Sequence, residues 1–142
     1  MRDALWFLES SEVFDGFIRE WRDGTLPKEE FTHAAHIAVG AWMAVEHPGD
    51  AFERTRDGIL RYNAATGTAN TATSGYHETL TRFWSHLIAA NVRGISDPLA
   101  AARHAVQTFA GRRGIYGEYY SFDVVGDAAA RVRWLAPDLA EL

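Results

Sequence analysis

Two histidines three residues apart open the most apolar stretch of this chain. His33 and His36 stand at the start of a run of apolar and small residues that continues to residue 45. Side chains at this spacing lie on one face of a helix, about one turn apart. Imidazole binds Zn, Fe, Mn and Ni, and it can also transfer protons near neutral pH. The pair therefore predicts a metal or proton-transfer site at one end of a buried helix.

A third histidine, His77, begins another amphipathic segment and follows Gly75 and Tyr76. If that segment is a neighbouring helix, His77 completes a three-histidine site with His33 and His36. Such a site leaves coordination positions for water or a substrate, which is typical of catalytic metal centres. We therefore expect one divalent transition metal, with Zn, Fe, Mn and Ni all compatible with the ligands.

The spacing of glutamates argues for one metal rather than two. Glu30 precedes His33 by three residues, as in the Glu-x-x-His motif of di-iron bundles, but those proteins need a second copy of the motif. None of the other five histidines has a glutamate three residues before it. Glu29 and Glu30 join the face of the histidine pair only if the helix begins before residue 29, whereas a helix that begins at Thr32 leaves them outside it.

Further polar residues are candidates for substrate contact and proton transfer. Glu78 and Glu30 are the candidate proton-transfer groups. The candidate substrate-binding residues lie beside a polar loop at residues 66–75 or on the following helix: Tyr62, Asn63, Asn70, Thr81 and Arg82. The competing interpretation is that these residues cap helices and turns, and that the histidines bond to backbone carbonyls.

The composition describes one globular domain over residues 1–142. The chain is 47% hydrophobic and 13% aromatic, which is enough for a core, and it contains no cysteine, so a metal would need His, Asp, Glu or water as ligands. Its net charge is -5 and its 14 Lys and Arg are scattered, which disfavours nucleic acid as a partner. No signal peptide or membrane-spanning run is present, so we expect a cytoplasmic protein.

Hydrophobic periodicity predicts an all-α bundle of about five helices with an irregular C-terminal region. The expected helices cover about residues 11–23, 27 or 32 to 45, 50–65, 76–90 and 98–110, with a further short helix near residues 127–134. Residues 111–117 contain three glycines and are expected to be irregular. Residues 119–125 are the one stretch whose composition suits a strand.

Several short motifs resemble a family of small uncharacterised bacterial helical proteins. They are Phe-Thr-His-Ala-Ala-His at 31–36, Arg-Tyr-Asn at 61–63, Gly-Tyr-His-Glu-Thr at 75–79, Tyr-Ser at 120–121 and Trp-Leu-Ala-Pro-Asp-Leu at 134–139. The resemblance covers most of the chain from about residue 25 and implies a shared site without an assigned activity. DinB-like metal-binding bundles, which hold a divalent ion with three helix-borne histidines, are a more distant analogy.

These observations lead to one principal hypothesis and two alternatives. The principal one is a mononuclear metal-dependent enzyme that acts on a small molecule. The alternatives are a helical module that binds a small ligand without catalysis, and a structural or interaction protein whose histidines belong to the core. Self-association into a homodimer is compatible with all three. Motifs of serine hydrolases, P-loop proteins, dinucleotide-binding folds, HD hydrolases and zincins are absent from the sequence.

Overall fold

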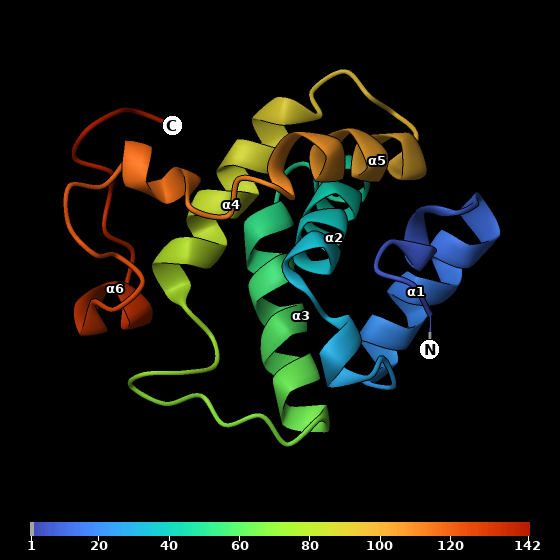
Figure 1. Ribbon diagram of the computed structural model, residues 1–142, viewed down its shortest axis with the longest axis horizontal. Helices are drawn as coiled ribbons and strands as arrows, with labels where there is room; N and C mark the ends of the chain where they lie inside the picture. The colour runs from blue at the N-terminus through green and yellow to red at the C-terminus, as the bar shows by residue number, and fades with distance from the viewer. Residues whose placement is uncertain (1) are drawn as a thin grey trace.

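The computed structural model describes residues 2–142, which form an all-helical bundle as the sequence predicts (Figure 1). In this part of the chain there are six α-helices, three 3-10 helices and no strand. The α-helices are α1 (Ser11–Asp23), α2 (His33–Glu46), α3 (Ala51–Ala65), α4 (Glu78–Asn91), α5 (Pro98–Phe109) and α6 (Ala128–Val132), and the 3-10 helices are η1 (Trp6–Leu8), η2 (Lys28–Glu30) and η3 (Ile115–Glu118).

Helix α2 is the centre of the bundle and packs against α3, α4 and α5 (Figure 1). Seven of its residues are buried, among them Ile37 and Val39, because nearly every face of this helix is apolar or small. A Cβ atom added to Gly40 would lie 2.8 Å from the Cδ1 atom of Ile88. The glycine therefore allows α2 and α4 to approach closely along the site described below.

The start of α2 decides which of the two sequence alternatives holds. Thr32 is the N-cap, and its hydroxyl accepts a hydrogen bond from the backbone N–H of Ala35 at 3.2 Å. The preceding 3-10 helix η2 is separated from α2 by Phe31 and Thr32, so Glu29 and Glu30 lie outside α2. They do not continue the histidine face along one helix.

Helix α1 covers one side of the bundle and contributes large aromatic side chains to the core. Ser10 caps its start, and Gly24, with φ of 76°, ends it in the left-handed region that favours glycine. Trp21 is 1% exposed and packs directly over α3, where a Cβ atom on Gly58 would come within 2.2 Å of its ring. This contact fixes α1 against α3.

The C-terminal segment folds back onto the start of α4, and α6 lies at the opposite end of the molecule from α1 (Figure 1). The hydroxyl of Thr79 donates to the carbonyl of Arg133 at 2.7 Å and accepts from the N–H of Leu135 at 3.0 Å. Tyr120 donates to the carbonyl of Leu135 at 2.7 Å. Residues 119–125 therefore pack as turns beside α4 and not as a strand.

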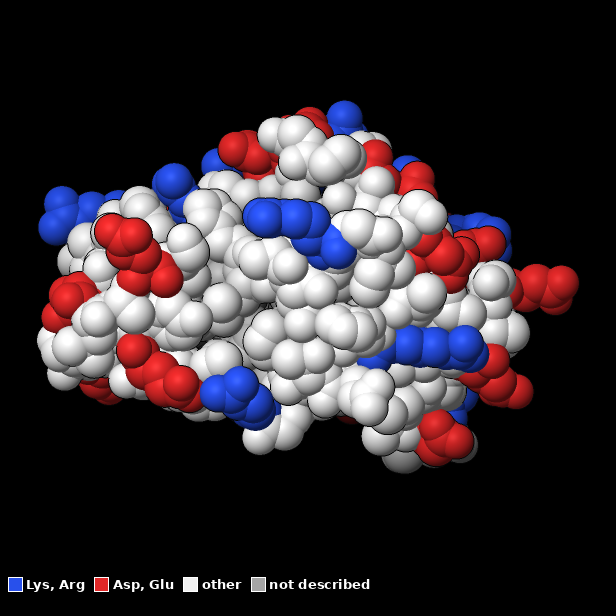
Figure 2. All heavy atoms as spheres, turned by 90° about the horizontal axis from the view of Figure 1, so that it is seen from above, with Lys and Arg blue, Asp and Glu red and all other residues white. Residues whose placement is uncertain are grey.

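The surface mixes both signs of charge. On the face in Figure 2, Lys and Arg are interspersed with Asp and Glu over broad uncharged areas. Among residues 2–142, no helix has the length and apolar character needed to cross a bilayer.

Candidate functional site

A cavity of about 580 Å³ lies where the first turns of α2 and α4 come together with α3 and the segment after α5. Side chains far apart in the sequence form its wall, including all three histidines proposed as metal ligands. The lining residues are Phe31, Thr32, His33, His36, Ile37, Gly40, Thr55, Ile59, Gly75, Tyr76, His77, Leu80, Thr81, Trp84, Ser85, Ile88, Arg113, Tyr116 and Val125. The cavity is the candidate functional site of this protein.

His36 presents a free nitrogen lone pair at this site. Its Nδ1 lies 2.9 Å from the carbonyl oxygen of Thr32, and because a carbonyl can only accept, Nδ1 carries the proton. The neutral ring therefore has an unprotonated Nε2. Phe31 stacks on the imidazole with ring centroids 3.7 Å apart and holds its orientation.

The surroundings of His36 keep its ring neutral. Desolvation lowers its pKa to about 4, because the residue lies deep among protein atoms. The residue nevertheless keeps accessible surface and belongs to the cavity wall. At neutral pH, His36 is thus available as a hydrogen-bond acceptor, a base or a ligand.

His33 has a buried nitrogen without a partner. Its Nε2 makes no hydrogen bond, and its ring meets the ring of Trp84 edge to face at 5.1 Å. Desolvation and then the charge of Arg113 lower the pKa of this histidine. The backbone carbonyl of Phe109 acts in the opposite direction and raises this pKa. An unpaired polar atom in a buried position is costly, so Nε2 of His33 would gain from a partner that reaches it.

His77 uses both ring nitrogens to hold the protein together. The N–H of Leu80 donates to its Nδ1 at 3.1 Å, so His77 is the N-cap of α4. Its Nε2 must then carry the proton, which it donates to the carbonyl of Val124 at 3.0 Å. The side chain lines the cavity but offers no free lone pair to a metal.

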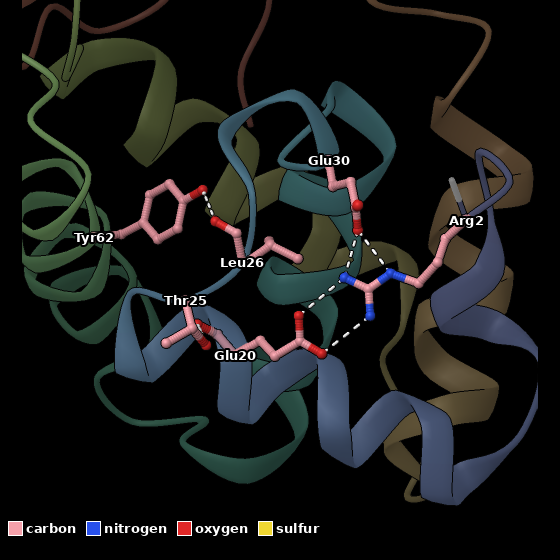
Figure 3. Close-up of polar contacts among 6 residues, drawn as sticks. All are labelled: Arg2, Glu20, Thr25, Leu26, Glu30 and Tyr62. Atoms are coloured by element: carbon pink, nitrogen blue, oxygen red, sulfur yellow. Dashed lines mark hydrogen bonds and ion pairs between the residues drawn. The ribbon is translucent and has the colours of Figure 1, made fainter.

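No cluster of three or more His, Asp or Glu that could hold a metal is found among residues 2–142. Both ring nitrogens of His77 are engaged in hydrogen bonds, and Glu30 belongs to η2 and does not line the cavity. The guanidinium of Arg2 donates to Glu30 at 2.8 Å from its Nε and also binds Glu20 (Figure 3). Glu30 is therefore paired with Arg2 and lies outside the cavity wall, so it is not placed to transfer a proton in the cavity.

Tyr62 also lies outside the cavity. Its hydroxyl donates to the carbonyl of Leu26 at 2.6 Å and so ties α3 to the turn before η2 (Figure 3). The residue is 3% exposed, and the hydroxyl is committed to that backbone contact. This is a structural role, and no surface of Tyr62 faces the cavity.

Glu78 is placed at the edge of the site through a neighbouring tyrosine. The hydroxyl of Tyr76 donates to Glu78 at 2.6 Å, and burial together with this contact raises the pKa of Tyr76. Tyr76 lines the cavity but Glu78 does not. Thr81, which does line it, donates its hydroxyl to the carbonyl of His77 at 2.7 Å.

The remaining predicted substrate-binding residues stabilise the loop or the surface. Asn63 donates to the side-chain oxygen of Asn70 at 3.0 Å, and that oxygen also accepts from the N–H of Tyr76 at 2.9 Å. Arg82 places its guanidinium 4.5 Å from the ring centre of Trp134. Asn63, Asn70 and Arg82 are not part of the cavity wall.

Several polar residues of the cavity wall were not among the predicted site residues, and two of them come from outside the predicted helices. Arg113 and Tyr116 reach the cavity from the segment after α5, which the glycines mark only as irregular. The adjacent Arg112 and Arg113 were the sequence feature that could have indicated a basic residue at the site, but the neighbouring sequence does not show which of the two lines the cavity. Trp84 of α4 also lines the cavity, and its ring meets the ring of His33 edge to face.

Comparison with known proteins adds no assignment, since no family profile, curated protein or solved structure matches this chain.

Proposed function

We propose that this protein binds a small molecule in the cavity between the first turns of α2 and α4. The observation that carries the proposal is the cavity itself, whose volume of about 580 Å³ is in the usual range for small-ligand sites. Most of the wall is apolar or aromatic, with a few polar groups that converge on it. This combination is typical of a pocket that buries a small ligand and orients it by one or two hydrogen bonds.

The apolar wall would provide most of the binding free energy. Ile37, Leu80 and Ile88 offer aliphatic surface, and Trp84 offers a ring face or edge. Burial of apolar ligand surface contributes roughly 25 cal/mol per Å² before the cost of association. The lone pair on Nε2 of His36 would accept a hydrogen bond from a ligand donor and so fix the orientation of the ligand.

The test is binding of small neutral aromatic molecules, measured by calorimetry and by quenching of tryptophan fluorescence. Leu80→Trp places a large side chain in the cavity and is expected to abolish binding. Leu87→Trp is the matched control, because Leu87 is half-buried on the same helix but does not line the cavity. Loss of binding in both variants, or in neither, would contradict this location of the site.

A second candidate is the metal-dependent site expected from the sequence, now reduced to two protein ligands. It is favoured by one observation: the Nε2 atoms of His33 and His36, one turn apart, make no hydrogen bond within residues 2–142. Water or a substrate would have to complete the coordination sphere of a Zn, Fe, Mn or Ni ion, and with such a ligand the ion could serve catalysis.

Metal binding is tested with protein purified without a histidine tag. Near-stoichiometric metal by elemental analysis, and its loss in a His33→Ala, His36→Ala double variant, would support this candidate. Metal-free protein whose melting temperature does not change on addition of Zn, Fe, Mn or Ni would exclude it.

A further inference from the structure

We infer that the ligand of this cavity is a carboxylate with an apolar body, and that Arg113 recognises its negative charge. The inference rests on the proposed binding function and specifies the chemical class of the ligand. It follows from the cavity wall, which includes the guanidinium of Arg113 but no carboxylate.

Arg113 is the one residue of the cavity wall that carries a charge at neutral pH, since burial lowers the pKa of each of the three histidines. The wall includes His33, His36, His77 and Arg113, but neither Asp nor Glu. The whole chain has 19 acidic residues and 14 Lys and Arg, so an acid-free wall runs against the composition. A cationic ligand would meet no counter-charge here, whereas an anionic ligand would.

Arg113 has no ionic partner of its own. It makes no salt bridge or side-chain hydrogen bond within residues 2–142, although it is exposed at the cavity. The neighbouring Arg112 differs in both respects, because it binds Glu118 at 2.9 Å and does not line the cavity. Arg113 is thus the guanidinium left available for a carboxylate, which it can bind with two parallel hydrogen bonds.

The charge of Arg113 is felt inside the cavity. After desolvation, it is the next largest effect that lowers the pKa of His33, and it also lowers the pKa of His36, where it is the smallest of the effects. The same positive charge that disfavours protonation of these imidazoles would stabilise an anion bound beside them in the cavity. Because the imidazoles are neutral at neutral pH, the site has one fixed positive charge and suits a singly charged ligand.

The two helices that border the cavity act in the same direction. Thr32, His33 and His36 belong to the N-terminal end of α2, and His77 and Thr81 to that of α4. The N-terminal end of a helix carries a partial positive charge. Both ends meet at one cavity, which adds to the effect of Arg113 on an anion.

Two carboxylates beside the cavity, Glu78 and Asp127, are engaged in hydrogen bonds with other groups. Glu78 accepts the hydrogen bond of Tyr76 at 2.6 Å, and its charge is felt by Arg56. Asp127, whose charge reaches His77, caps α6 by accepting from the N–H of Ala130 at 2.8 Å. Neither residue lines the cavity, so neither repels an anion from inside it.

The walls select the rest of the ligand. Phe31, Trp84 and Tyr116 surround the cavity with aromatic surface, which a small polar anion would leave in contact with water. A phosphate monoester carries close to two negative charges near neutral pH, which the single positive charge of Arg113 does not balance. The geometry therefore points to an aryl or alkyl monocarboxylate.

Three probes of nearly the same shape test this inference by calorimetry: 2-naphthoate, 2-naphthamide and 2-naphthylmethylammonium. We expect the carboxylate to bind about tenfold more tightly than the amide, as one charge-assisted contact implies, and the ammonium more weakly than the amide. Arg113→Gln should remove the preference for the carboxylate over the amide. Arg112→Gln should retain it, since Arg112 faces Glu118.

The possible results separate the inference from the proposed function. Equal binding of carboxylate and amide overturns the charge inference but leaves a ligand-binding cavity. Failure of all three probes to bind overturns both. A carboxylate preference that survives Arg113→Gln, in a variant whose melting temperature equals that of the wild type, overturns the role given to Arg113.

Discussion

Replacement of His77 by alanine is expected to lower the free energy of unfolding by about 2–4 kcal/mol. Both ring nitrogens are engaged with the backbone, and the residue is only 7% exposed. The substitution removes the cap on Leu80 and leaves the carbonyl of Val124 without its donor. The loss should be felt at the junction of α4 with the C-terminal segment.

The magnitude follows from the two bonds separately. Loss of an N-cap costs about 1 kcal/mol, and a buried polar group left without a partner costs about 1–3 kcal/mol. His77→Asn separates them, because asparagine is a good N-cap but is too short to reach Val124. We expect this variant to retain the capping contribution and to be less destabilised than His77→Ala.

Urea unfolding followed by circular dichroism measures this effect. The experiment is done at pH 8 with a chelator present, so that the imidazoles are neutral and no metal contributes. His86→Ala is the control: His86 lies exposed on the same helix, makes no hydrogen bond in the described chain, and should change stability by less than about 0.5 kcal/mol.

The chelator makes the result informative about the metal hypothesis. A residue that acts only as a metal ligand stabilises the fold only when the metal is bound. If His77→Ala unfolds at the same urea concentration as the wild type without metal, the structural role of His77 is refuted.

Three further predictions concern packing, buried hydrogen bonds and pH. Gly58→Ala should destabilise the fold by about 1–3 kcal/mol in thermal unfolding, because its Cβ would lie 2.2 Å from the ring of Trp21, whereas Gly16→Ala, which meets no atom within 4 Å, should stabilise α1 by about 0.5–1 kcal/mol. Thr79→Val should cost about 2–4 kcal/mol in urea, since the isosteric side chain loses a donated and an accepted bond at a fully buried position; a loss below about 0.5 kcal/mol would contradict this. The contribution of His36 to stability should not change with pH well above 6.5 and should fall as the pH is lowered towards 4. The reason is that the folded-state pKa of His36 lies below the unfolded value of 6.5, so the unfolded chain binds the extra proton. A melting temperature that rises as the pH is lowered over that interval would contradict this prediction.

Most of the fold could be predicted because its helix ends are encoded locally. Ser10, Thr32, Asp97 and Asp127 each accept a hydrogen bond from the first turn of the helix they precede. Gly24 ends α1 in a conformation that glycine adopts without strain. These signals lie within a few residues of the boundary, so periodicity and capping chemistry were sufficient to predict the helices, although they left the start of α2 open between residues 27 and 32.

The candidate site was only partly predictable. Four of the residues selected from the sequence do line the cavity: His33, His36, His77 and Thr81. Arg113 and Tyr116 were not selected, because they come from a segment without periodicity, and only the docking of that segment against α2 and α4 brings them to the site. Residue type indicated the helical part of the cavity, whereas tertiary packing determined the rest.

The position of a histidine relative to the start of its helix separates the role of His36 from that of His77. The first N–H groups of a helix have no intrahelical partner, so a polar side chain just before the helix is drawn to them. His77 stands at that position and is consumed by the cap on Leu80. His36 lies inside the first turn and donates back to the carbonyl of Thr32, which leaves Nε2 free. A histidine at the N-cap position should therefore be assigned to the backbone first, and the metal or ligand role should be kept for histidines inside the helix, such as His33 and His36.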